Sequence, residues 1–278
     1  MKIKLLLALV VMSLFSCSSD DTSMVKKLDM IKTTFYNAFS GTETGYGVHE
    51  FDNRDRVATY KQYDADEVLL ITMEYTYGQF GPDEIKTFDG DNFTSPSSIA
   101  TFNYDGDGRL LKHETIAYVW GQTISSGQTY VYNEDNSITA TDKDGAVKTY
   151  YKNKSGRINK IVSADDTQRV SYEGDNMETS DGNGKSYNYT YDPVYEPKGN
   201  AHKIMACVFN GNQQNAILFA GFGVMELGVS RLVAARYDLD GLDNIEYEYE
   251  YAGGYPSVCS EYHNKAANPL VKREIFYK

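Results

Sequence analysis

The feature that most constrains this fold is a short turn motif that recurs along the chain. Its clearest copy is Tyr104-Asp105-Gly106-Asp107-Gly108-Arg109-Leu110, in which an aromatic residue precedes Asp, a polar stretch, Gly and an apolar residue. Asp and Asn side chains bond to nearby backbone N–H groups, and Gly accepts the positive φ that a tight turn requires. The motif therefore predicts a β-hairpin, in which the aromatic residue ends one strand and the apolar residue begins the next.

Further copies of this motif follow one another at strand-like intervals. They are residues 51–57, 132–138 and 151–158, the start of another at 237–241, and degenerate forms at 141–147 and 251–254. Strands that hairpins join in sequence order form an up-and-down meander. We expect an all-β fold, an antiparallel up-and-down meander of roughly 12–14 strands that is curved or closed into a barrel.

Tyrosines alternate with polar residues between these turns. In IEYEYEY at 245–251, Tyr247, Tyr249 and Tyr251 fall on one face of a strand and the glutamates fall on the other. A sheet of this size must bury one face, so we expect Tyr and Phe to point inward and the acids outward. A membrane-spanning barrel needs an outward apolar band on every strand. The Glu, Asn and Thr faces favour a lipid-tethered barrel or half-barrel instead.

The first residues carry the pattern of a secretory signal. Lys2 and Lys4 precede an apolar run over residues 5–15, which is too short to span a membrane. We expect a signal peptide over 1–16, a lipid-anchored tether over 17–40 and a β-meander domain over 41–278. Cleavage at this site would move the net charge from −12 to −14.

An apolar insertion at 201–235 interrupts the tyrosine pattern. Its glycines at 221, 223 and 228 interrupt any long helix, so a short helix with loops fits the segment. We expect this insertion to plug one end of the barrel, whose interior needs apolar filling. The alternative is that it forms the lid or wall of a ligand pocket against the inward tyrosines.

Residues 14–17, Leu-Phe-Ser-Cys, resemble the lipobox of bacterial lipoproteins. Residues 18–21, Ser-Ser-Asp-Asp, resemble the acidic export tag of surface lipoproteins in the Bacteroidota. This resemblance implies that Cys17 is acylated and anchors the protein in outer-membrane lipid, with the barrel facing the cell exterior. A plain secretory signal with a coincidental cysteine is the alternative.

The turn blocks at 51–57, 104–110 and 132–138 also resemble the YD repeats of Rhs-type shell proteins. The whole chain, with its lipobox and the segment 201–235, resembles a family of Bacteroidota surface lipoproteins of unknown function that have a porin-like fold. What this resemblance implies is the architecture of a curved or closed β-meander. It implies no activity.

Composition and motif searches exclude several functions. An acidic chain repels phosphate backbones, so we expect no nucleic-acid partner. The histidines at 49, 113, 202 and 263 show no zinc-binding spacing, and no nucleophile elbow or phosphate-binding loop is present. Acid clusters such as Asp142/Asp144 lack the spacing of a calcium loop. We therefore expect no catalytic residue, no metal and no cofactor.

Aromatic side chains are the remaining candidates for ligand binding, because sugars stack on exposed Tyr and Trp rings. Tyr118 and Trp120, the only tryptophan, are expected to share a face of one strand. The other candidates are Phe219 and Phe222 in the insertion and Tyr247 and Tyr249 on the inner face. Burial in the rim or core is the alternative for each.

Cys207 and Cys259 remain for a disulfide once Cys17 is acylated, and two buried free thiols are the alternative. We expect a monomeric, surface-anchored, non-catalytic binding module whose partner is a glycan or an envelope protein. A structural scaffold of the envelope, or a carboxylate-dependent glycoside hydrolase or lyase, are the alternatives.

Overall fold

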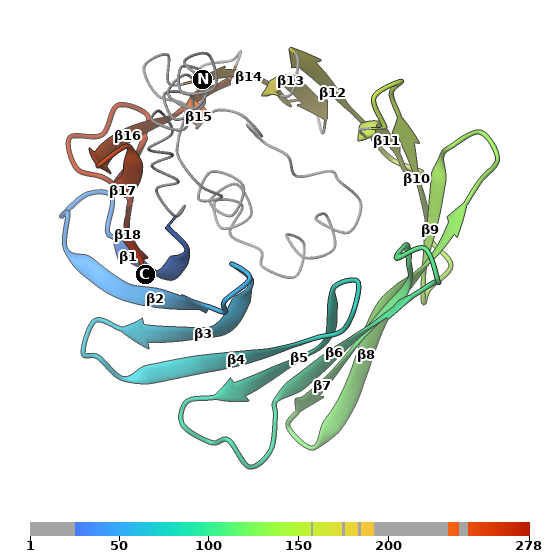
Figure 1. The fold of residues 1–278 in the computed structure, drawn as a ribbon, viewed down its shortest axis with the longest axis horizontal. Coiled ribbons are helices and arrows are strands. Elements are labelled where there is room, and N and C mark those ends of the chain that lie inside the picture. Colours follow the sequence, from blue (N-terminus) through green and yellow to red (C-terminus); the bar gives the residue numbers. More distant parts are fainter. Residues whose placement is uncertain (1–25, 157, 174–175, 183–184, 192–232, 239–243) are drawn as a thin grey trace, which may run out of the picture.

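The protein is an all-β barrel of 18 strands (Figure 1). The computed structural model describes residues 26–156, 158–173, 176–182, 185–191, 233–238 and 244–278. The strands are β1 (Leu28–Tyr36), β2 (Glu43–Phe51), β3 (Val57–Asp64), β4 (Leu69–Tyr77), β5 (Pro82–Asp89), β6 (Ser98–Tyr104), β7 (Leu110–Val119), β8 (Gln122–Tyr132), β9 (Ile138–Asp142), β10 (Val147–Lys152), β11 (Ile158–Val162), β12 (Thr167–Glu173), β13 (Asn176–Gly182), β14 (Lys185–Tyr191), β15 (Val233–Asp238), β16 (Ile245–Ala252), β17 (Tyr255–His263) and β18 (Val271–Tyr277).

Each strand pairs antiparallel with its neighbours in sequence, and the first strand closes the ring. β1 pairs with β2 on one side and with β18 on the other, where Ile31 lies opposite Ile275. The expected antiparallel up-and-down meander is confirmed, and it is closed. The strand number exceeds the expected 12–14, because several turns, such as Trp120–Gly121, lack the Asp–Gly pattern from which strands were counted.

The barrel begins earlier than the expected domain boundary at residue 41. β1 lies inside the segment 17–40 that we expected to be a tether. Its Ile31 and Thr33 are buried on the core-facing side of the sheet, and β1 has a hydrogen-bonded strand on both sides. Most of the insertion 201–235 lies outside the described residues, and its last three residues begin β15. The described residues contain no helix.

The Asp-containing turns have the geometry that the motif predicts. Asp105 Oδ1 accepts hydrogen bonds from the N–H groups of Asp107 and Arg109, both at 2.9 Å. Gly108 has a φ of +81°, which costs an L side chain energy but not glycine. The Arg109 Nε then donates to Asp105 Oδ2 at 2.6 Å, which ties the last residue of the turn to the first.

Tyrosine hydroxyls connect each hairpin to an earlier one. The Tyr132 hydroxyl donates to the Leu110 carbonyl at 3.2 Å, and the Tyr132 ring lies 5.2 Å from the Arg109 guanidinium. The same arrangement joins Tyr77 to the Val57 carbonyl at 2.9 Å, with Arg56 over the Tyr77 ring. Further bonds of this kind run from Tyr104 to Pro82, Tyr172 to Ile158 and Tyr277 to Pro256. The aromatic residue of the turn motif therefore also links neighbouring hairpins.

One face of the described sheet carries its buried core residues. Its core residues form two clusters, one around Ile85, Phe102, Leu110 and Ile138 and the other around Leu28, Ile31, Cys259 and Ile275. A closed barrel crowds side chains on its concave side, so we assign this face to the interior.

The expected orientation of the rings is confirmed on β16, where tyrosines are half-buried and Glu248 and Glu250 are exposed. Tyr46 and Tyr63 are exceptions, because they stack on each other on the opposite face.

The turns alternate between the two ends of the barrel. The end at which β1 begins and β18 ends, here called the proximal end, carries both termini of the barrel and the turns at 52–56, 105–109 and 133–137. The opposite, distal end carries the turns at 37–42, 65–68, 90–97 and 120–121. Large exposed apolar side chains gather at the distal end: Phe39, Val68, Leu70, Phe93, Tyr118, Val119, Trp120, Ile124, Val147 and Tyr237.

Candidate functional site: the β7–β8 hairpin

The tip of the β7–β8 hairpin holds Trp120, which with Phe39 is one of two almost fully exposed aromatic residues at the distal end of the described sheet. Trp120 is 99% exposed and has a φ of +50°, and Gly121 follows with a φ of +74°. Two consecutive positive φ values make a type I′ turn, in which Asn or Gly is usual at the first position. A bulky residue in this region is a strained choice, and such strain is common at functional sites.

The side chains next to the tip are also apolar and exposed. Tyr118 is 47% exposed and Ile124 is 55% exposed. Val119 pairs with Gln122, and Ala117 pairs with Ile124, so Val119 and Ile124 share one face of the hairpin while Tyr118 lies on the other. The tip therefore presents apolar groups on both of its faces.

β8 extends well beyond its neighbour β9. β8 has 11 residues and β9 has five, and their pairing ends at Gln128 opposite Asp142. β9 ends there because the Asp142 carboxylate accepts hydrogen bonds from the N–H groups of Asp144 and Ala146, which begins the turn to β10. Among the described residues no strand pairs with Gln122–Gly127 on the β9 side, so this part of β8 is a sheet edge.

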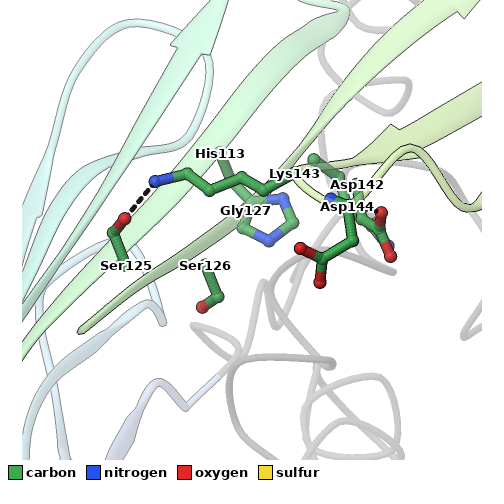
Figure 2. A pocket seen from close by; sticks show the side chains of 8 residues that line it. His113, Ser125, Ser126, Gly127, Asp142, Lys143 and Asp144 are labelled. Atoms are coloured by element: carbon green, nitrogen blue, oxygen red, sulfur yellow. Dashed lines mark hydrogen bonds between the residues drawn. The ribbon is translucent and has the colours of Figure 1, made fainter.

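A polar pocket lies where this edge meets the β9–β10 turn (Figure 2). Its volume is about 330 Å³. The lining residues are His113 on β7, residues 125–128 on β8, and Asp142, Lys143 and Asp144 on the turn. Figure 2 shows the two carboxylates on the side of the pocket opposite Ser125 and Ser126.

The floor of the pocket is a short hydrogen-bonded chain. The Tyr130 hydroxyl donates to Gln128 Oε1 at 3.0 Å and lies 2.9 Å from His113 Nδ1. Burial lowers the pKa of His113 and raises that of Tyr130, so both groups are neutral near pH 7.

Lys143 crosses the outer face of β8 and forms an ion pair on β7. Its Nζ lies 2.8 Å from Glu114 Oε1 and also donates to Ser125 Oγ, and Lys112 contacts the other oxygen of Glu114 at 2.9 Å. The two lysines lower the pKa of Glu114 to about 2. The positive charge of Lys143 is therefore paired with Glu114 at the Ser125 rim of the pocket, while Asp144 remains exposed.

A second polar group lies on the core-facing side of strands β2, β3, β17 and β18. The Arg273 guanidinium contacts Glu261 Oε2 at 3.0 Å, and Glu261 Oε1 lies 2.7 Å from His263 Nε2. Burial and the nearby Arg273 lower the pKa of His49 to about 4. The ring of His49 packs 4.6 Å from the ring of Tyr60. His49, Glu261 and Arg273 are buried in the core, so we regard this group as structural.

The structure brings together two of the residues expected to bind a ligand. Tyr118 and Trp120 both lie at the hairpin tip, but Trp120 occupies the turn and does not share a strand face with Tyr118. Tyr247 and Tyr249 instead pack against the core cluster that contains Cys259. Phe219, Phe222 and the acylation residue Cys17 lie outside the described residues.

Cys259 is a free, fully buried thiol in the structure. Burial raises its pKa to about 12. Its expected disulfide partner, Cys207, lies outside the described residues.

Sequence reasoning did not identify His113, Ser126 or Asp144 as neighbours. Asp142 and Asp144 were recognised only as turn residues. The difference in length between β8 and β9 was the signal that could have indicated a free edge.

Among the described residues no group of three or more His, Cys, Asp or Glu is arranged to hold a metal ion. The described part of the chain also holds no apolar helix of membrane-spanning length.

The fold resembles that of solved Bacteroides structures. A porin-like protein from Bacteroides uniformis matches with a TM-score of 0.55 and 12% identity, over 90% of this chain and 96% of that one. A porin-like protein from Bacteroides vulgatus matches with a TM-score of 0.45 and 15% identity, over 91% and 99%. At these identities the first match shows a shared fold.

A curated relative matches in sequence over part of the chain. It is the tRNA3(Ser)-specific nuclease WapA of Bacillus spizizenii, which is 29% identical over 151 residues, or 51% of this chain. The match spans only 6% of that protein's length. No protein-family model matches the chain.

Proposed function

We propose that this protein is a lipid-anchored surface protein of the outer membrane, and that its barrel is a non-catalytic binding module for glycans. The observation that carries the proposal is Trp120, which is 99% exposed in a turn that normally excludes bulky residues. An exposed indole in a strained backbone is costly unless it contacts a partner.

The position of the tip supports a role at the cell exterior. A lipid at Cys17 would hold the proximal end of the barrel, because β1 begins there at Leu28. The ten intervening residues reach about 35 Å when extended. The Trp120 tip lies at the distal end of the barrel, so an anchored barrel would present it away from the membrane.

The chemistry of the hairpin suits a sugar. The C–H face of a pyranose ring packs on an aromatic ring, and its hydroxyls donate to carboxylates. Tyr118 and Trp120 supply rings at the tip, and Asp142 and Asp144 supply acceptors in the pocket further along β8, so a chain of several sugars would be needed to contact both. Acidic glycans would be repelled by these carboxylates, so neutral sugars are the expected class.

A glycan-array screen of the unlipidated chain, residues 18–278, tests this proposal. We expect binding to neutral glycans that falls about tenfold in Trp120→Ala, since stacking contributes about 0.5–1.5 kcal/mol beyond the buried area. Phe39→Ala is the matched control, because Phe39 is also 99% exposed but lies on the β1–β2 turn. Silence across the array, or equal binding by wild type and Trp120→Ala, would contradict the proposal.

A second candidate function is attachment to another envelope protein. The unpaired edge of β8 favours it, because an exposed edge offers backbone donors and acceptors to a partner chain.

A further inference from the structure

We propose that the edge of β8 from Gln122 to Gly127 binds an extended peptide segment of another protein as an added strand, with a basic side chain of that peptide in the His113 pocket. This inference rests on the second candidate function and does not depend on glycan binding.

The pairing register identifies the backbone groups that would bind the peptide. Val119 and Gln122 flank a two-residue turn, and such flanking residues exchange both of their backbone hydrogen bonds. In an antiparallel pair these bonds recur at every second residue, so Gln122, Ile124 and Ser126 bond to β7. The N–H and C=O groups of Thr123, Ser125 and Gly127 therefore point away from β7, toward the open side.

A strand added on the open side would have a defined direction. A peptide there would continue the track of β9, antiparallel to β8, since β9 occupies that track up to Asp142. The free edge covers six residues, or about 20 Å. Residues 122–126 are exposed, so nothing described in the structure covers them.

The pocket at the inner end of this track favours a basic side chain. A strand-binding site gains affinity from main-chain bonds and specificity from side-chain pockets. The pocket is lined by Asp142, Asp144, Lys143, neutral His113 and uncharged Ser and Gln side chains. The Lys143 ammonium is paired with Glu114 and bonded to Ser125, which leaves the two carboxylates as the charge available to a ligand. A volume of about 330 Å³ admits a lysine or arginine side chain.

A second copy of this chain fits the site less well. Two β8 edges could pair about a two-fold axis, but the segment Gln122–Gly127 contains no basic residue that could enter the pocket. The charge of the pocket therefore points to a different protein as the partner.

Panning a random octapeptide library against residues 18–278 tests the proposal. We expect enriched peptides with one Lys or Arg beside a run of residues of high strand propensity. Resynthesis with single N-methyl groups should abolish binding at alternate positions only, because every second N–H would face β8. Absence of enrichment, enrichment of acidic peptides, or loss of binding without a period of two would overturn the proposal.

Two variants with matched controls locate the site. Ser125→Pro removes an outward N–H, which an edge strand tolerates, and should weaken peptide binding by about tenfold or more. Ser125→Ala keeps that N–H and should bind as wild type does. Asp144→Asn should weaken a lysine peptide by about twofold to fivefold and leave its norleucine analogue unchanged.

These variants also separate the outcomes. Circular dichroism and unfolding by urea confirm that each variant folds. Ser125→Pro should leave glycan binding unchanged. The glycan-binding and peptide-binding proposals can therefore fail independently of each other. Equal peptide affinity of Ser125→Pro and Ser125→Ala would overturn the proposal, as would a concentration-dependent dimer in sedimentation that only Ser125→Pro abolishes.

Discussion

Tyr132→Phe tests the tyrosine bonds that link neighbouring hairpins. The substitution removes only the hydroxyl that donates to the Leu110 carbonyl at 3.2 Å, and the ring can keep its contact with Arg109. A hydrogen bond of this kind contributes about 0.5–1.5 kcal/mol to stability. Because the Leu110 carbonyl would lose this partner in a half-buried place, we expect the free energy of unfolding to fall by about 1 kcal/mol.

Urea unfolding, followed by far-ultraviolet circular dichroism, measures this effect. The midpoint should fall while the slope m stays constant, because the surface exposed on unfolding is the same. Tyr118→Phe is the matched control, since Tyr118 is half-exposed and no bond of this type joins it to an earlier hairpin. If Tyr132→Phe changes the free energy no more than Tyr118→Phe does, these hydroxyl bonds do not stabilise the barrel.

Three further predictions concern charge, packing and anchoring. The pKa of His49, lowered to about 4, means that the unfolded chain binds a proton that the folded chain does not between pH 6.5 and 4. Stability should therefore fall by about 3 kcal/mol as the pH drops through this window, and His49→Asn should abolish that slope in urea titrations. Gly127→Ala should cost about 1–3 kcal/mol, because a Cβ there would overlap the His113 carbonyl oxygen, whereas Gly106→Ala has open space. Cys17→Ser should move the protein out of the membrane fraction, and its retention there would contradict acylation.

The hairpins were predictable because the turn chemistry is local. Asp105 and Gly108 act within one turn, so the pattern of their types is enough to predict the geometry. The alternation on β16 was predictable for a similar reason. Successive side chains of a strand point to opposite faces, so Tyr249 lies on the buried face and Glu248 on the exposed one.

Closure of the barrel was harder to predict from the sequence. β1 carries no turn motif before it, and its place depends on pairing with β18, more than two hundred residues away in the chain. Strand counting failed at turns such as Trp120–Gly121, where a Trp occupies a position that Asn or Gly usually fills.

The candidate site was predictable only in part. Trp120 stood out as the single tryptophan beside a glycine, which pointed to the hairpin that carries the candidate site. Its turn conformation, the free edge of β8 and the grouping of His113 with Asp144 depend on where β9 ends. The packing of Tyr249 against Cys259 is a tertiary contact that no local pattern encodes.

Fluorescence of Trp120 tests most directly whether the β7–β8 tip is the recognition element. Trp120 is the only tryptophan, so the emission reports on this residue alone. In the free protein we predict red-shifted emission that acrylamide quenches about as efficiently as it quenches a short tryptophan peptide. A neutral glycan that binds should shift the emission to the blue and protect it from acrylamide. Blue-shifted, protected emission in the free protein, or binding that leaves the spectrum unchanged, would contradict the account.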